Sequence, residues 1–233
     1  MKKYFKIVFV LVTIFFYNEM SFGQKGKIKP PTKKKIATVV GASDTQMNFS
    51  GKFEGSKYTN SFFGFKITMP ENWIIQEKDV NDAIKKIGEE QIKGKTKQVQ
   101  GALDEAVQRV TVLFTTSKDI FGMADNAALI LGAEKMSPLT KIRNGNDYMR
   151  LTLQSYKLMQ LPPDYQYSEN ILTEKFNTEV FSYIDIQRTG YKQRVYATAR
   201  KSYALFFTVQ FVKQKDLDTM REVLEKTDFN WKP

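Results

Sequence analysis

Four acidic residues lie near the expected ends of helices or strands, where catalytic carboxylates are often found: Asp125, Glu134, Asp147 and Asp185. A glycan hydrolase needs two carboxyl groups about 5–10 Å apart in a cleft. Acidic residues are so frequent in this chain that some close pairs are expected by chance. A carboxylate-based glycan hydrolase is therefore kept as an alternative function and is not the first choice.

Two absences exclude most other catalytic chemistry. The chain of 233 residues contains no cysteine and no histidine. Ser-His-Asp and Cys-His nucleophilic systems cannot form without these residues. Zinc sites built from Cys and His, and haem or copper sites held by His, are excluded for the same reason. We predict no cofactor, no metal site and no catalytic residue. Disulfides and a lipidated cysteine are also excluded, so the fold must depend on its core.

A Ser-Lys dyad is the remaining nucleophilic option. Lys201 and Ser202 are neighbours on an expected strand, where adjacent side chains point to opposite faces. Ser155 and Lys157 lie on an expected helix, where residues two apart diverge. Neither pair can act together, and we expect a protein that is not an enzyme.

The N-terminal residues 1–23 have the composition of a signal peptide. Three lysines in the first six residues precede an unbroken apolar run over 7–16, and Ser21 and Gly23 are small residues before Gln24. The run is too short for a transmembrane helix, which needs about 20 apolar residues. We predict an exported protein, periplasmic or secreted, although retention of the segment as an anchor is left open.

Residues 24–57 are expected to form a basic flexible linker. They contain eight lysines against Asp44 and Glu54, a net charge of +6, and a pair of prolines. Lys33, Lys34 and Lys35 form its densest charge and could contact a polyanion or an anionic membrane surface weakly; a solvated spacer is the alternative. Residues 58–233 have 25 basic and 22 acidic side chains, a balance that argues against nucleic-acid binding.

The rest of the chain alternates between strand and helix periodicities. Helical spacing extends over 79–107, although Gly94 and Gly101 suggest two helical pieces. Asn144 begins a polar stretch that is better explained by helix capping than by a calcium loop. We predict strands over 63–69, 73–75, 110–116, 127–136, 168–176, 179–188, 191–201 and 203–212, and further helices over 147–159 and 216–226. This order predicts an α/β (α+β) fold with a central, mostly antiparallel sheet and helices on both faces.

Aromatic and apolar positions at both ends of this region resemble those of PsbP-like domains. The first group is Tyr58-x-Asn60 followed by Phe63-Gly-Phe-x-Ile-x-Met-Pro70-x-x-Trp73, and the second comprises Gln193–Tyr196, Tyr203–Thr208 and Phe229. The resemblance covers residues 58–233 and implies a three-layer α/β/α sandwich. Members of this group act mainly as binding or assembly modules, and the shared pattern contains no catalytic residue.

These observations together predict an exported, non-catalytic binding or assembly module of the bacterial cell envelope. Its expected partner is another envelope protein. Besides the glycan hydrolase, a small-ligand or lipid carrier is an alternative, because the 18 Phe and 11 Tyr residues could line a cavity. The simpler explanation is that they fill a core on both sides of the sheet.

Overall fold

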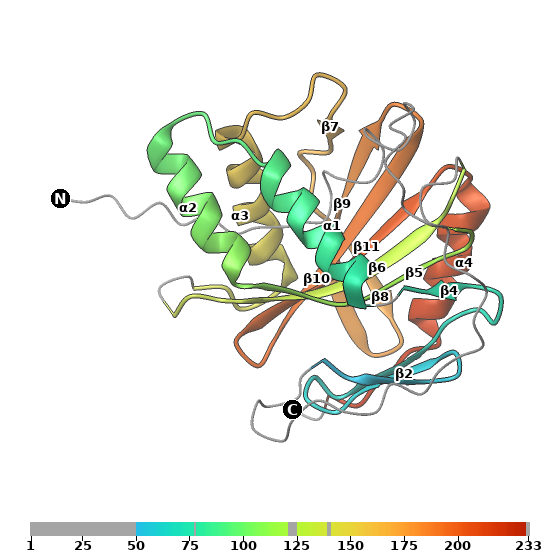
Figure 1. Ribbon diagram of the computed structural model, residues 1–233. Helices are drawn as coiled ribbons and strands as arrows, with labels where there is room; N and C mark the ends of the chain where they lie inside the picture. The colour runs from blue at the N-terminus through green and yellow to red at the C-terminus, as the bar shows by residue number, and fades with distance from the viewer. Residues whose placement is uncertain (1–49, 77, 121–124, 139–140, 232–233) are drawn as a thin grey trace.

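The computed structural model describes residues 50–76, 78–120, 125–138 and 141–231 (Figure 1). The predicted signal peptide, most of the predicted linker and Lys33, Lys34 and Lys35 lie outside these residues, and those predictions stay untested. In the part of the chain that is described, no helix has both the length and the apolar character needed to cross a membrane.

Within the described ranges, the strands form two sheets in which every pairing is antiparallel. The small sheet has the order β1 (Lys52–Glu54), β2 (Lys57–Asn60), β3 (Phe65–Thr68), β12 (Asp228–Phe229). The large sheet has the order β4 (Ile74–Ile75), β5 (Val110–Ser117), β6 (Ala128–Lys135), β11 (Tyr203–Phe211), β10 (Tyr191–Arg200), β9 (Glu179–Arg188), β7 (Gln166–Tyr167), and β8 (Leu172–Phe176) also pairs with β9.

Four helices complete the fold of the described residues: α1 (Lys78–Gln91), α2 (Lys97–Gln108), α3 (Gly145–Leu158) and α4 (Gln214–Glu225). Figure 1 shows α1, α2 and α3 together on one side of the large sheet, with α4 and the small sheet elsewhere. We call the side that packs against α2 and α3 the helical face, and the side that packs against α4 and the small sheet the aromatic face. The predicted antiparallel sheet with helices on both faces is confirmed.

Side chains along each central strand point alternately to the two faces, so one strand contributes to the cores on both sides of the large sheet. In β11, Leu205, Phe207 and Val209 belong to the core of the aromatic face, whereas Ala204 and Phe206 belong to the core of the helical face. All five side chains are fully buried. A strand covered on both sides is expected to be apolar at nearly every position, as this one is.

The small sheet was not predicted as a separate layer. It changes two predicted boundaries, the start of the strand expected over 63–69 and the end of the expected linker. The strand expected over 63–69 begins at Phe65, because Phe63 and Gly64 lie in the preceding turn and Gly64 has φ of 76°. β1 lies inside the range expected to be linker, and Phe53 from this strand packs against Phe114, with ring centroids 5.1 Å apart. The folded chain therefore begins before Tyr58.

The residues that resemble those of PsbP-like domains are hydrogen-bonded to one another or buried in the core. Asn60 holds the turn after β2, because its Oδ1 accepts a hydrogen bond from the Phe63 amide at 2.9 Å. Its Nδ2 donates to the Tyr58 hydroxyl at 3.1 Å. Tyr58, Phe63 and Trp73 are buried in the core of the aromatic face. This stretch thus closes one layer of the fold.

The helical region expected over 79–107 forms two helices, α1 and α2, which are separated near Gly94 as the sequence suggested, whereas Gly101 lies inside α2. A Cβ atom added at Gly94 would lie 2.6 Å from the Gln100 backbone nitrogen, so the close approach of the connection requires glycine. The Gln100 side chain accepts a hydrogen bond from the Gly94 amide at 2.8 Å. Thr96 then caps α2 by accepting from the Val99 amide at 3.2 Å.

Candidate functional site

The four candidate carboxylates are held by four different sets of neighbours. Glu134 is buried on the helical face, where the Tyr148 hydroxyl donates to its Oε2 at 2.9 Å and Arg109 Nη2 lies 3.6 Å from its Oε1. Burial, together with the nearby Glu134 carboxylate, raises the pKa of Tyr148. Asp125 pairs with Lys213 at 3.7 Å.

Asp147 has the capping role that the sequence predicted. Its backbone amide donates to Asn144 Oδ1 at 2.9 Å, and its own Oδ2 accepts from the Arg143 amide at 3.0 Å. These two bonds fix the first turn of α3. In the described chain, no cluster of three or more acidic side chains is placed to hold a metal ion.

In each of the two Ser-Lys pairs, one side chain is hydrogen-bonded elsewhere, and the first pair does not lie where it was expected. Lys201 and Ser202 do not lie on a strand; they form the turn between β10 and β11, with φ of 48° and 62°. Lys201 Nζ donates to the Phe62 carbonyl at 2.6 Å. On α3, the Ser155 hydroxyl donates to the Leu151 carbonyl at 2.9 Å.

Asp185 belongs to a larger polar network that reaches a groove. Asp185 of β9 lies directly opposite Arg194 of β10, so the two side chains leave the same face of the sheet. Arg194 Nε donates to Oδ1 at 2.7 Å and Nη2 donates to Oδ2 at 2.9 Å. The guanidinium also lies 4.2 Å from the centre of the Tyr183 ring. Burial opposes the charge on Arg194, but the hydrogen bonds to Asp185 outweigh it and raise its pKa.

Glu174 of β8 extends this network to α4. Its carboxylate accepts from the Tyr196 hydroxyl at 2.8 Å and from Arg221 Nε at 2.6 Å. Arg194 Nη1 lies 3.8 Å from the same carboxylate. Arg221 in turn pairs with Asp218 of α4 at 3.8 Å. Strands β8, β9 and β10 are thereby joined to α4 through charged side chains.

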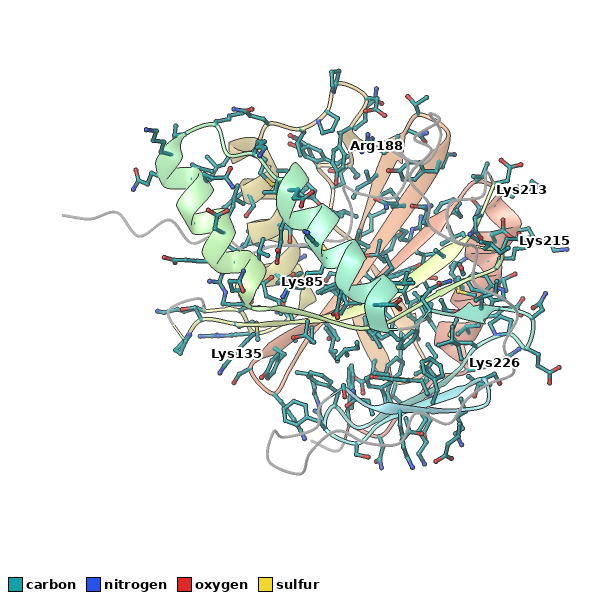
Figure 2. The ribbon with its side chains drawn as sticks, in the orientation of Figure 1. Lys85, Lys135, Arg188, Lys213, Lys215 and Lys226 are labelled. Carbon is teal, nitrogen blue, oxygen red and sulfur yellow. The ribbon has the colours of Figure 1, made fainter. Side chains whose placement is uncertain are left out.

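Two grooves flank the network. The first, between β8 and α4, is lined by Glu174, Lys175, Phe176, Asp218, Arg221, Glu222 and Glu225. The second is lined by Gln166, Tyr167, Ser168, Asp185, Ile186, Gln187, Lys192, Gln193, Arg194, Phe211, Gln214 and Leu217. We call the network and its two grooves the α4 surface. Figure 2 shows Lys213 and Lys215 near one end of α4 and Lys226 near the other.

The sequence contained a pattern that could have revealed half of this network. Thr189 and Gly190 separate the strands expected over 179–188 and 191–201 by a tight turn, and counting outward equally from that turn places residue 185 opposite residue 194. The contribution of Glu174 and Arg221 could not be found in this way, because it depends on where α4 packs.

No family model matches the chain, and no curated protein matches it. The solution structure of a cyanobacterial PsbP from Synechocystis covers 82% of this chain and 98% of its own, with 10% identity and a TM-score of 0.42. A crystal structure from Bacteroides thetaiotaomicron covers 72% of this chain at 14% identity and a TM-score of 0.38. The match spans only 46% of that protein's own length. A PsbP protein is thus among the solved structures similar to this chain, in agreement with the resemblance predicted from sequence.

Proposed function

We propose that this chain is a non-catalytic binding module, exported to the bacterial cell envelope, that contacts another envelope protein through the α4 surface. The observation that carries the proposal is the network of hydrogen bonds and ion pairs around Arg194. It holds Asp185, Glu174 and Arg221 in fixed positions between two grooves. Charged groups that are already positioned lose little conformational freedom when a partner binds.

The same contacts argue for binding and against hydrolysis. Both carboxylate oxygens of Asp185 accept hydrogen bonds from Arg194, and Glu174 accepts from Tyr196 and Arg221. The general acid and the nucleophile of a glycosidase must instead reach the atoms of the scissile glycosidic bond.

The first groove indicates the chemistry of the partner. Four acidic side chains, Glu174, Asp218, Glu222 and Glu225, face two basic ones, Lys175 and Arg221. This excess of acid favours a partner surface that carries lysine or arginine. Arg194 stacked on Tyr183 supplies the kind of rigid aromatic and guanidinium group that often dominates interface energetics.

Site-specific photo-crosslinking in the native envelope tests this proposal. A photoreactive residue replaces Gln187 in the second groove or Glu222 in the first, and Glu105, exposed on α2, is the matched control position. We expect the same envelope protein to be captured from both groove positions and not from Glu105. Arg221→Gln should abolish this capture while leaving the circular dichroism spectrum unchanged. Equal capture from all three positions, or none, would overturn the proposal.

Export and the linker are tested separately. Fractionation and intact mass measurement should find the protein outside the cytoplasm with its first 23 residues removed. Replacing Lys33, Lys34 and Lys35 with Gln tests whether the basic run contributes to envelope binding. If capture is unchanged, the run serves only as a spacer.

A further inference from the structure

Strand β8 forms an open edge of the large sheet. It pairs with β9 on one side, and no strand of the described chain pairs with its other side. The other strands that end a sheet within the described ranges, β1, β4, β7 and β12, have only two or three residues, whereas β8 has five. An open edge invites another strand to pair with it. This length makes β8 the edge best suited to accept one.

The turn after β8 determines which of its backbone groups face outward. A two-residue turn over 177–178 joins β8 to β9, and Phe176 and Glu179 on either side of it are register partners. Residues that flank such a turn exchange backbone hydrogen bonds, and bonded positions alternate along an antiparallel pair. The amide and carbonyl groups of Thr173 and Lys175 therefore point away from β9. Both residues are exposed, so water occupies these groups in the free protein and an added strand can replace it.

The β8–β9 hairpin also exposes apolar side chains. Among the described residues, Val180 and Leu172 are the most exposed large hydrophobic side chains, at 55% and 50%. Val180 lies opposite Lys175, and Leu172 lies on β8 itself. A strand beside β8 would bury part of Leu172, and burial of apolar surface favours its binding.

The first groove lies along β8 and determines the chemistry of an added strand. Its lining comes from β8 and α4. Asp218, Glu222 and Glu225 of α4 are exposed, and their spacing of four and three residues places them in a row along one side of the helix. Arg221, which also lines this groove, is already paired with Glu174. Side chains of an added strand that point to the aromatic face would therefore lie beside an excess of negative charge.

We infer that β8 binds an extended segment of the partner as an added strand, with lysine or arginine at alternate positions. The inference rests on the proposed function, in which the α4 surface contacts another envelope protein. Backbone hydrogen bonds to Thr173 and Lys175 provide affinity, and alternate basic side chains over the first groove provide specificity.

A second copy of this chain is a poorer occupant of the edge. Antiparallel pairing of two β8 strands over their whole length would place Glu174 of one copy directly opposite Glu174 of the other. Like charges in directly opposite positions destabilise a strand pair. A basic segment of a different protein has no such conflict.

Substitution of Thr173 tests the backbone contact. Thr173→Pro removes the outward amide, and proline is tolerated where an edge strand faces solvent. Thr173→Ala, the matched control, removes the same side chain but keeps the amide. The probe is a synthetic peptide of alternating lysine and valine, and fluorescence anisotropy measures its binding. Thr173→Pro should weaken binding at least about fivefold, as expected for a lost hydrogen bond, and Thr173→Ala less than about twofold. Equal binding by the two variants would overturn the inference.

Amide hydrogen exchange tests the same contact in the wild type, and so does not depend on whether Thr173→Pro folds. With near-saturating peptide, the amides of Thr173 and Lys175 should exchange about tenfold more slowly. The amides of Leu172, Glu174 and Phe176, which already bond to β9, should change little. Unchanged exchange at Thr173 and Lys175, or equal protection of all five amides, would contradict strand addition.

Charge reversal tests the chemistry of the added strand. A peptide with glutamate in place of lysine should bind the wild type at least about tenfold more weakly. Glu222→Lys should reduce this difference, whereas Glu105→Lys, at an exposed position on α2, should retain it. Equal binding of the two peptides, or no binding of the lysine peptide, would exclude a basic added strand.

The proposed function fails or stands separately, through photo-crosslinking from the two grooves. A partner that Thr173→Pro and Thr173→Ala capture equally well would retain the α4 surface as a binding site and exclude strand addition. Loss of capture in Thr173→Pro alone is the result that we expect.

Discussion

The two faces of the large sheet are built from the same strands but are closed in different ways. On the aromatic face, rings pack against rings: Phe181 and Phe207 lie 5.6 Å apart, and Phe65 and Phe229 continue the group. On the helical face, close approach depends on missing side chains. A Cβ at Gly132 would lie 2.1 Å from the Phe206 ring. A Cβ at Gly145 would lie 2.1 Å from the Ala197 carbonyl oxygen. The packing of the aromatic face depends on the volume of its buried rings. The packing of the helical face depends on glycine positions where no side-chain atom fits.

The aromatic face should be most sensitive to lost volume. Phe207 is fully buried among other rings, and Phe207→Ala should lower the free energy of unfolding by about 4 kcal/mol. Urea denaturation measures this change. Phe207→Leu, which keeps most of the volume, should cost less than half as much. Similar losses for the two variants would show that ring packing is not what closes this face.

The helical face should instead be sensitive to added volume. Gly132→Ala forces a methyl group into the Phe206 ring and should cost about 3 kcal/mol. Gly101→Ala is the matched control, because nothing lies within 4 Å of its added Cβ and it is inside α2. That variant should be more stable by about 1 kcal/mol. Phe206→Leu should relieve part of the Gly132→Ala defect in a double variant; purely additive losses would contradict the assigned contact.

High pH provides a third test of the helical face. Burial is the main factor that raises the pKa of Tyr191 from 10.0 to about 12. The unfolded chain therefore ionises at this residue before the folded one does. The stability that Tyr191 contributes is complete below pH 10 and is lost as the pH rises toward 12. Between pH 9 and 11.5, the wild type should lose about 2 kcal/mol more than Tyr191→Phe. Equal losses would show that Tyr191 does not titrate as its burial implies.

The smallest expected effect concerns the attachment of α4 to the aromatic face. Lys118 Nζ lies 2.9 Å from Asp216 Oδ1, and Asp216 is buried in the first turn of the helix. The Lys118 side chain is 41% exposed, so solvent weakens the pair, and Lys118→Met should cost about 1 kcal/mol. Lys226→Met, which removes a largely exposed pair with Glu222, should change stability little. A loss as large for Lys226→Met would show that α4 is not anchored through Asp216.

Strands that follow one another through short turns were predictable from the sequence. The strands expected over 179–188, 191–201 and 203–212 correspond to β9, β10 and β11 within one residue. Local periodicity and turn residues determine such hairpins. The small sheet was missed, because β12 joins β3 from the other end of the described chain. The α4 surface was missed for the same reason, since Glu174 and Arg221 meet only after α4 packs. Patterns among residues that are close in the sequence do not show which distant segments pair in the folded protein.

The pairing of β12 with β3 has a consequence for how the chain folds. The C-terminal strand Asp228–Phe229 completes a sheet that the N-terminal strands begin, and Phe229 also packs against Phe181. A ribosome releases β3 long before β12 exists, so this sheet can close only after synthesis of the domain is finished. Such a high contact order slows folding. Until then, β3 presents an unpaired edge that can join strands of other molecules. A stop codon just before Asp228 should therefore produce aggregation, because it leaves the edge of β3 without its partner strand.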